Sequence, residues 1–273
     1  MWPPALGALG FTRKVFPFTR GIWETGMPHE GQTGVVFESG GNKLLGTLLL
    51  ALGDEPKPTA LLLHGVPGIE KNFDLAHALR DAGWNSLIFH FRGSWGSAGD
   101  YGFETLADDA RAALDHLSSG AHEQIDPKRY ALVGHSMGGW TAVKTAARDE
   151  RVRAVVTIGA VTEPSRVQFT AAMAEVSFTP YLTGITPAEF ETRWQGLDGV
   201  LEEAGSLDRP LLIVHSDQDA LVPVEQAHLL SGASGGRARL ELHPEANHAF
   251  VWHRRWLIDL VVPWLDDAVR LRG

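Results

Sequence analysis

The sequence predicts an α/β fold: a doubly wound, mostly parallel sheet with a small helical cap. Short apolar runs without polar alternation are typical of strands buried on both faces. They alternate with segments whose apolar residues recur at the three- and four-residue spacing of a helix. This alternation implies right-handed βαβ crossovers. The 273 residues, of which 44% are hydrophobic and 21% charged, fit one large α/β domain or two small ones.

The composition excludes several classes of protein and of site. The chain has no cysteine, which excludes disulfides, thiolate zinc sites and a cysteine nucleophile. Its 24 Lys and Arg against 33 Asp and Glu give a net charge of −9, which argues against nucleic-acid binding. No apolar run approaches the roughly 20 residues that span a bilayer. The N-terminus lacks a basic region, so we expect no secretory signal and a cytoplasmic location.

The N-terminal part differs from the rest of the chain. Residues 1–32 are rich in glycine, proline and isolated aromatic residues and keep no helix or strand period, so we expect an irregular arm. Residues 33–273 are expected to form the α/β domain. Within it, residues 35–38 and 43–50 flank a Ser-Gly-Gly-Asn turn, which predicts a hairpin.

The remaining elements follow in alternation. Buried parallel strands are predicted at residues 60–63, 86–91, 130–133, 154–158 and 211–214. Helices are predicted at residues 73–82, 104–117, 140–147, 224–230 and 256–265, and Pro263 predicts a kink or boundary in the last of them. Residues 161–206 carry helical patterns but no strand. We therefore expect them to form a small cap over the sheet edge that bears the active site.

A strand-to-helix turn carries the sharpest chemical motif. Gly-His-Ser-Met-Gly at 134–138 places Ser136 between two glycines, after an apolar strand and before a helix. The serine in such a turn has a strained backbone, and neighbouring Cβ atoms would collide with the strand and helix. The turn exposes the hydroxyl at a helix N-terminus, where the N–H of Met137 faces developing negative charge. Ser136 is therefore the predicted nucleophile.

Two downstream loops supply partners for this serine. The strand at 211–214 runs into a loop with two candidate acids, and we favour Asp219 because the loop then closes directly into a helix. Asp217, nearer the strand, is better suited to cap the turn. His248 follows a short strand in a polar loop and can act as a general base near neutral pH. The order Ser, Asp, His is that of α/β hydrolases.

With these motifs, residues 34–272 resemble the α/β-hydrolase superfamily, and more closely its cofactor-free serine hydrolases of the esterase and prolyl-oligopeptidase-like type. The resemblance implies the α/β-hydrolase fold. His-Gly-Val-Pro-Gly at 64–68 matches the oxyanion loop of the family. This match implies that the N–H groups of Val66 and Met137 form the oxyanion hole.

A second loop also resembles one that is typical of the family, but it differs from the family pattern at two positions. Residues 92–99, Arg-Gly-Ser-Trp-Gly-Ser-Ala-Gly, carry Trp95 where the family has a glycine, and His90 stands where an aspartate is common. We call the turn at residues 134–138 the elbow. We expect Trp95, and Trp140 beside the elbow, to border the substrate pocket. No metal or cofactor is expected. His243, His248 and His253 lie five residues apart, and this spacing places them together neither on one face of a helix nor on one face of a strand.

These residues predict a serine hydrolase that acts on a small-molecule carboxylic ester through an acyl-enzyme. The cap favours short or medium acyl chains over peptides and long-chain triglycerides. Relatives that open epoxides or displace halide carry aspartate as nucleophile, which disfavours those reactions. Three alternatives stay open: a cofactor-free perhydrolase, a non-catalytic ligand receptor, and a peptidase or amidase that holds a substrate ammonium on a cap glutamate (Glu163, Glu175, Glu189 or Glu191). The sequence leaves the oligomeric state open.

Overall fold

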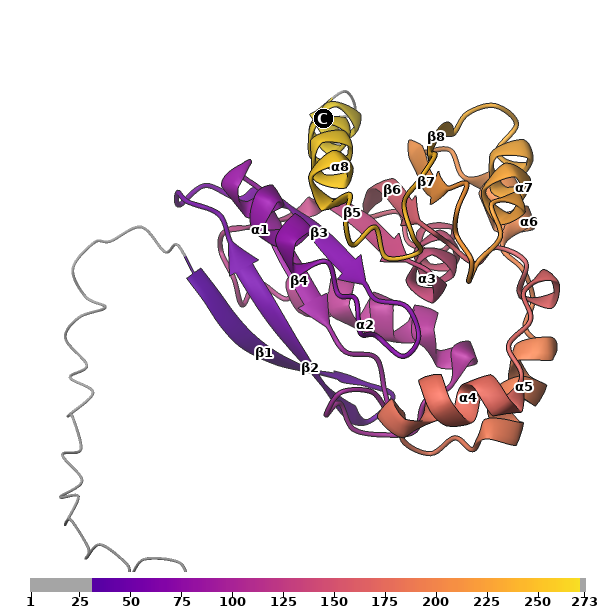
Figure 1. Cartoon of the computed structure of the whole chain (residues 1–273). Helices are drawn as coiled ribbons and strands as arrows, with labels where there is room; N and C mark the ends of the chain where they lie inside the picture. Colours follow the sequence, from indigo (N-terminus) through magenta and orange to yellow (C-terminus); the bar gives the residue numbers. More distant parts are fainter. Residues whose placement is uncertain (1–30, 271–273) are drawn as a thin grey trace, which may run out of the picture.

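An eight-stranded sheet forms the centre of the computed structural model, which describes residues 31–270 (Figure 1). The strands are β1 (Gly31–Ser39), β2 (Asn42–Leu50), β3 (Lys57–Leu63), β4 (Asn85–Phe89), β5 (Ile125–His135), β6 (Val152–Ile158), β7 (Leu211–Ser216) and β8 (Arg239–His243). Their order across the sheet is β1-β2-β4-β3-β5-β6-β7-β8. The pairs β1·β2 and β2·β4 are antiparallel, and the other pairs are parallel. This topology confirms the predicted fold class.

Helices cover both faces of the sheet and bury its central strands. One face carries α1 (Phe73–Asp81) and α8 (Arg254–Arg270). The other carries α2 (Leu106–Leu117), α3 (Met137–Ala146) and α7 (Glu225–Ala233), and the short helix η1 (Phe103–Thr105) leads into α2. Every residue of β4 and β7 is buried, because apolar side chains pack on both sides of these strands.

The winding direction of the chain reverses between β3 and β5. After β3 the chain adds β4 on one side, then crosses over to place β5, β6, β7 and β8 in turn on the other side. The carboxyl ends of two neighbouring parallel strands therefore lead into loops that diverge. Such a switch point leaves a crevice at the sheet edge, where open α/β sheets bind ligands.

Helical segments without a strand connect β6 to β7. They are η2 (Pro164–Arg166), α4 (Ala171–Ser177), η3 (Thr179–Tyr181), α5 (Pro187–Gln195) and α6 (Leu201–Ser206). Of these, α4 and α5 lie beyond this edge of the sheet, whereas α6 lies beside α7 (Figure 1). We call residues 161–206 the cap. Its backbone is bonded to the body at Thr183, whose N–H donates to Gly93 at 2.8 Å and whose carbonyl accepts the N–H of Tyr101 at 2.8 Å.

Two expectations about the chain ends need adjustment. Residues 1–30 of the expected arm lie outside the described residues, and residues 31–32 already belong to β1. Pro263 does not end the last helix, since α8 continues past it to Arg270. The proline removes one helical hydrogen bond, but Leu257, Val261 and Leu265 are fully buried against the sheet and hold the helix on both sides of it.

Candidate active site

Ser136 lies at the turn between β5 and α3, in the crevice at the switch point. Its φ of 55° and ψ of −120° are strained for a residue with a side chain. A Cβ on Gly134 would lie 2.1 Å from the carbonyl oxygen of Gly138, and a Cβ on Gly138 would lie 2.0 Å from that of Leu63. Both positions therefore need glycine, as the motif predicts, and the turn presents Ser136 at the first turn of α3.

The structure brings Asp219, and not Asp217, to His248. Oδ2 of Asp219 lies 2.7 Å from Nδ1 of His248, and its Oδ1 accepts the N–H groups of Leu221 and Val222, both at 2.9 Å. The Asp217 side chain is exposed. Burial of Asp219 by itself would raise the pKa of its carboxyl, but the hydrogen bond and charge of His248 outweigh burial and lower that pKa. The carboxylate is therefore ionised and holds Nδ1 of His248 in its protonated form.

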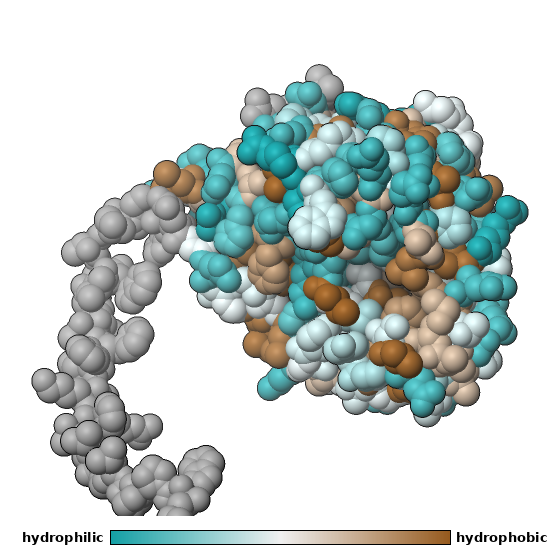
Figure 2. Space-filling model, in the orientation of Figure 1, coloured by the Kyte–Doolittle hydropathy of each residue, from teal (hydrophilic) through white to brown (hydrophobic). Residues whose placement is uncertain are grey.

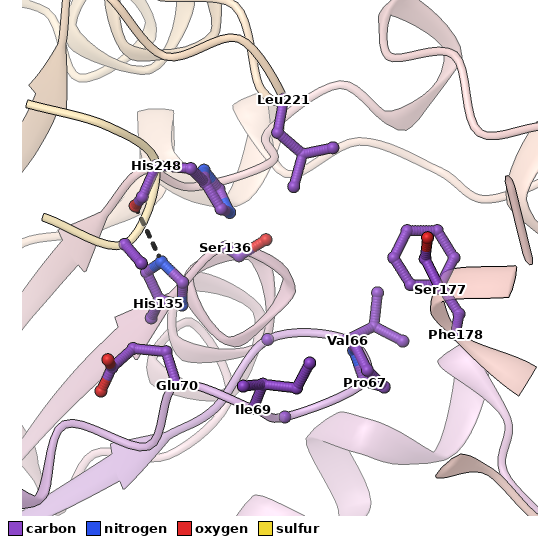
Figure 3. A pocket seen from close by; sticks show the side chains of 13 residues that line it. Val66, Pro67, Ile69, Glu70, His135, Ser136, Ser177, Phe178, Leu221 and His248 are labelled. Atoms are coloured by element: carbon purple, nitrogen blue, oxygen red, sulfur yellow. Dashed lines mark hydrogen bonds between the residues drawn. The ribbon is translucent and has the colours of Figure 1, made fainter. Parts of the chain in front are cut away.

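Ser136 and His248 line the same cavity, and Figure 3 shows the imidazole beside the serine. The ring sits against the end of β6, where Gly159 has a φ of +54° and a Cβ would lie 3.2 Å from Nδ1 of His248. Gly159 thus leaves room for the ring. No sequence motif singles out this glycine, because its role depends on a loop that lies far along the chain.

The loop after β3 passes directly over the serine. A Cβ on Gly65 would lie 2.7 Å from Cβ of Ser136, so only glycine allows this approach. The N–H groups of Val66 and Met137 donate no hydrogen bond to any atom of the described residues. Unpaired amides beside a serine are the kind of donor that binds an oxyanion in acyl transfer. The structure thus places both predicted oxyanion residues at the elbow.

His64 fixes this loop rather than taking part in proton transfer. Its Nδ1 donates to the carbonyl of Gly65 at 2.7 Å, and its Nε2 accepts the N–H of Phe91 at 3.4 Å. Burial lowers the pKa of the ring to about 3. His64 is therefore neutral at ordinary pH and connects the loop to the end of β4.

The cavity beside Ser136 has a volume of about 240 Å³ and walls from five parts of the chain. Its lining residues are 65–70, His135, Ser136, Ser177, Phe178, Leu221, His248 and Ala249. Figure 3 shows Ser136 and His248 at one side and Phe178 of the cap at the other. Phe178 is itself held by ring contacts to Phe169 and Phe190, with centroids 5.0 and 5.1 Å away. The cap thus closes the cavity with a buried aromatic wall.

The prediction that Trp95 and Trp140 border the cavity is wrong, because neither residue lines it. The Trp140 indole is buried and donates to the carbonyl of Asp198 at 2.9 Å. Trp95 stacks on Tyr181 with ring centroids 5.4 Å apart, and its indole N–H donates to the outer side of the oxyanion loop, at the carbonyl of Pro67. Trp95 therefore supports the loop at Pro67 without lining the cavity, and Trp140 belongs to the core.

Within residues 31–270, no three His, Asp or Glu side chains are grouped so as to hold a metal ion. No helix in the same part of the chain combines the length and the apolar character needed to cross a membrane.

Comparisons with known proteins show the family to which the chain belongs. A sequence profile described as the alpha/beta hydrolase fold matches residues 58–198. An uncharacterized protein of Mycobacterium tuberculosis is 29% identical over 199 residues, which cover 70% of this chain and 63% of that protein. An uncharacterized peptidase of Bacillus subtilis is 26% identical over 222 residues, 72% of this chain and 31% of the peptidase. The chain thus spans less than two thirds of either relative.

Solved structures share the architecture. The esterase domain of a Rhodothermus marinus protein has a TM-score of 0.65 and 24% identity and covers 88% of this chain and 99% of that domain. Est1E from Butyrivibrio proteoclasticus, solved with ferulic acid, has a TM-score of 0.73 and 20% identity and covers 86% of this chain and 99% of Est1E. At these identities the likeness concerns the fold alone. Because the profile spans more than half of the 273 residues, the chain belongs to the alpha/beta hydrolase fold family.

Proposed function

We propose that the chain is a serine hydrolase that cleaves carboxylic esters with short or medium acyl chains. The observation that carries the proposal is the 2.7 Å contact of His248 with Asp219 in a cavity that also holds Ser136. Because Asp219 accepts the Nδ1 proton, the lone pair of His248 is on Nε2. This nitrogen is then available as a base for the serine hydroxyl.

In the first half of the reaction, Oγ of Ser136 bonds to the acyl carbon while its proton passes to Nε2 of His248. The carbonyl oxygen becomes an oxyanion and binds the free N–H groups of Val66 and Met137. When the bond to the alcohol oxygen breaks, the imidazolium gives its proton to that oxygen. An acyl group remains on Ser136 and the alcohol leaves.

In the second half, a water molecule gives a proton to Nε2 of His248 and attacks the acyl carbon. The bond to Oγ then breaks, the proton returns to Ser136, and the carboxylic acid leaves. Asp219 keeps its charge throughout, which agrees with its lowered pKa, and it stabilises the imidazolium in both halves.

The cavity supports a small apolar acyl group. Its volume of about 240 Å³ lies below the range of roughly 300–1,000 Å³ that is typical of sites for drug-sized ligands. Val66, Leu221 and Phe178 present aliphatic and aromatic side chains to it. Ile69 lines the cavity and is also 67% exposed, so it stands at the mouth. Hydrophobic side chains also gather on the cap side of the face seen in Figure 2.

An α-ammonium substrate finds less support. None of the four cap glutamates considered for that role is among the described residues that line the cavity. Oε2 of Glu189 bonds to Thr186, and Oε2 of Glu191 accepts the N–H of Ala171. Glu70 does line the cavity, but one of its carboxylate oxygens accepts the N–H of Asn72 at 2.6 Å. The geometry therefore favours an ester over an aminoacyl amide.

The test is the hydrolysis of p-nitrophenyl butyrate, p-nitrophenyl palmitate and an aminoacyl p-nitroanilide by the purified protein, with Ser136→Ala as the control. We expect the butyrate to have the highest kcat/KM and a fluorophosphonate to label Ser136 in the wild-type protein only. A preference for the anilide would contradict the ester proposal. Absence of both turnover and labelling would favour the ligand receptor, and peracid formation from acetate and hydrogen peroxide without ester turnover would favour the perhydrolase.

A further inference from the structure

His135, the residue between Gly134 and Ser136, makes a contact that the mechanism above does not use. Its Nε2 lies 3.0 Å from the carbonyl oxygen of His248, drawn as the dashed line in Figure 3. The two imidazole rings also pack together, with centroids 4.7 Å apart and planes inclined by 46°. Since a carbonyl oxygen only accepts hydrogen bonds, Nε2 of His135 carries the proton and donates it.

The ring of His135 is neutral and buried. Burial, reinforced by the nearby charge of His248, lowers the pKa of His135 to about 3. Its Nδ1 is buried and has no hydrogen-bond partner within the described residues. His135 therefore does not compete with His248 for the serine proton. Its ring makes one hydrogen bond, to the carbonyl of His248, and its buried Nδ1 stays unpaired, which costs free energy.

This bond anchors the main chain of His248 itself, whereas Ser216 and Arg254 hold its loop at the carbonyls of Ala246 and Ala249. Residues 244–253 join β8 to α8 without a helix or strand. Within the described part of the chain, the main chain of His248 makes only one hydrogen bond, the one to His135. The side chain is held by Asp219 at one end, and the backbone is held by His135 at the other.

We propose that His135 is a positioning residue for the proposed ester hydrolysis: it fixes the backbone of His248 so that the imidazole meets both Asp219 and Ser136. The elbow thus supplies two adjacent side chains with different tasks. Ser136 forms the bond to the substrate, and His135 sets the place of the base. The inference rests on the proposed function, because it assigns a part in the same reaction.

Two substitutions separate the hydrogen bond from the ring contact. His135→Phe keeps an aromatic ring and removes the donor. His135→Gln removes the ring, but its amide nitrogen can reach the position of Nε2 and donate. Tyr130→Phe is the matched control, because it removes the bond between Tyr130 and Ser118 at 2.9 Å in the same strand, away from the cavity.

The measurement is kcat and KM with p-nitrophenyl butyrate, per active site counted by end-point fluorophosphonate labelling. His135→Phe should lower kcat about 10²-fold with KM within twofold, as a misplaced base does. His135→Gln should recover most of kcat, and the Tyr130 control should keep it. Normal kcat per labelled site in His135→Phe would show that His135 only supports folding. Equal losses of kcat in both variants would contradict the assignment of the positioning role to the hydrogen bond.

The rate at which the fluorophosphonate labels Ser136 gives a second readout that needs no ester. It should fall in His135→Phe and recover in His135→Gln. If the wild-type protein cleaves no ester, the proposed function fails, and the labelling rates still decide the role of His135. If the wild-type protein cleaves esters and His135→Phe does so equally well per site, the inference alone fails.

Discussion

The N–H of Leu221 donates to Oδ1 of Asp219 at 2.9 Å, so a wall of the cavity is held by the carboxylate that orients His248. The two oxygens of Asp219 divide these tasks, since Oδ1 binds the loop and Oδ2 binds the imidazole. In the proposed mechanism, Asp219 therefore couples the shape of the cavity to the position of His248.

Replacing Asp219 should separate the two tasks. In Asp219→Asn, the amide oxygen can still accept from Leu221, but the amide group cannot hold the Nδ1 proton of His248. We expect kcat to fall on the order of 10⁴-fold, while the ratio of butyrate to octanoate turnover stays near the wild-type value. Asp219→Ala should lose both kcat and the selectivity. Asp217→Asn is the control, and a comparable loss there would overturn the assignment of the acid.

Shortening Phe178 should change the acyl chain that the enzyme prefers. The ring closes the far side of the cavity and packs on buried aromatic rings, so Phe178→Ala opens space behind it. We expect the ratio of octanoate to butyrate kcat/KM to rise by about tenfold or more, since each methylene that finds room in an apolar pocket is worth at least roughly that factor. Val176→Ala, at a side chain that is 76% exposed, serves as the control. An unchanged chain-length profile would place the acyl group elsewhere.

A methyl group at position 159 should displace the base. In Gly159→Ala the new Cβ lies 3.2 Å from Nδ1 of His248, and the φ of +54° adds strain. We expect lower kcat and a loss of stability of about 1–2 kcal/mol. Gly235→Ala has a similar φ of +62° with nothing within 4 Å, so it should lose similar stability and keep kcat. Equal kcat in the two variants would show that the ring adapts.

Two buried histidines should make the protein less stable in acid. Burial lowers the pKa of His64 and His135 to about 3, whereas imidazole in an unfolded chain titrates near 6.5. The contribution of these two neutral rings to the free energy of unfolding is fully present above about pH 6.5. As the pH falls from 6.5 to 3, the unfolded chain binds protons that the folded chain does not, so the free energy of unfolding falls by about 1.4 kcal/mol per unit and residue.

Urea unfolding at pH 7.5 and pH 5.0 checks this dependence. For His135→Gln, the loss of unfolding free energy between the two pH values should be smaller than for the wild-type protein by about 2 kcal/mol. His228→Gln, at an exposed histidine, should leave the loss unchanged. The same pH dependence in all three proteins would mean that the buried ring is protonated as readily as in the unfolded chain.

The sequence alone was enough to predict the positions of the side chains that are set by the local backbone. Ser136 sits where glycines allow β5 to turn into α3, and the reason for those glycines, close contact with neighbouring carbonyls, follows from the motif itself. Asp219 and His248 follow two neighbouring parallel strands, β7 and β8, so their loops must meet at one edge of the sheet.

The cavity walls could not be predicted in the same way. Trp140 lies four residues after Ser136, and the helical period alone would place both on nearly the same face. The indole instead packs in the core and donates to the carbonyl of Asp198, a contact that no local pattern encodes. Phe178 and Leu221 reach the cavity through the packing of the cap and the acid loop, which no local pattern encodes. The bond from His135 to His248 likewise joins residues 113 positions apart.

The division between sheet edge and cap has a consequence for how such an enzyme can diversify. Ser136, its amides and the ends of the strands belong to the sheet, whereas Ser177 and Phe178 come from a segment inserted between β6 and β7. The insertion begins and ends at adjacent parallel strands. Its length and composition can therefore vary without altering the register of the sheet. A new substrate can therefore be accommodated by exchanging this segment, without any change to the residues that we propose break the ester bond.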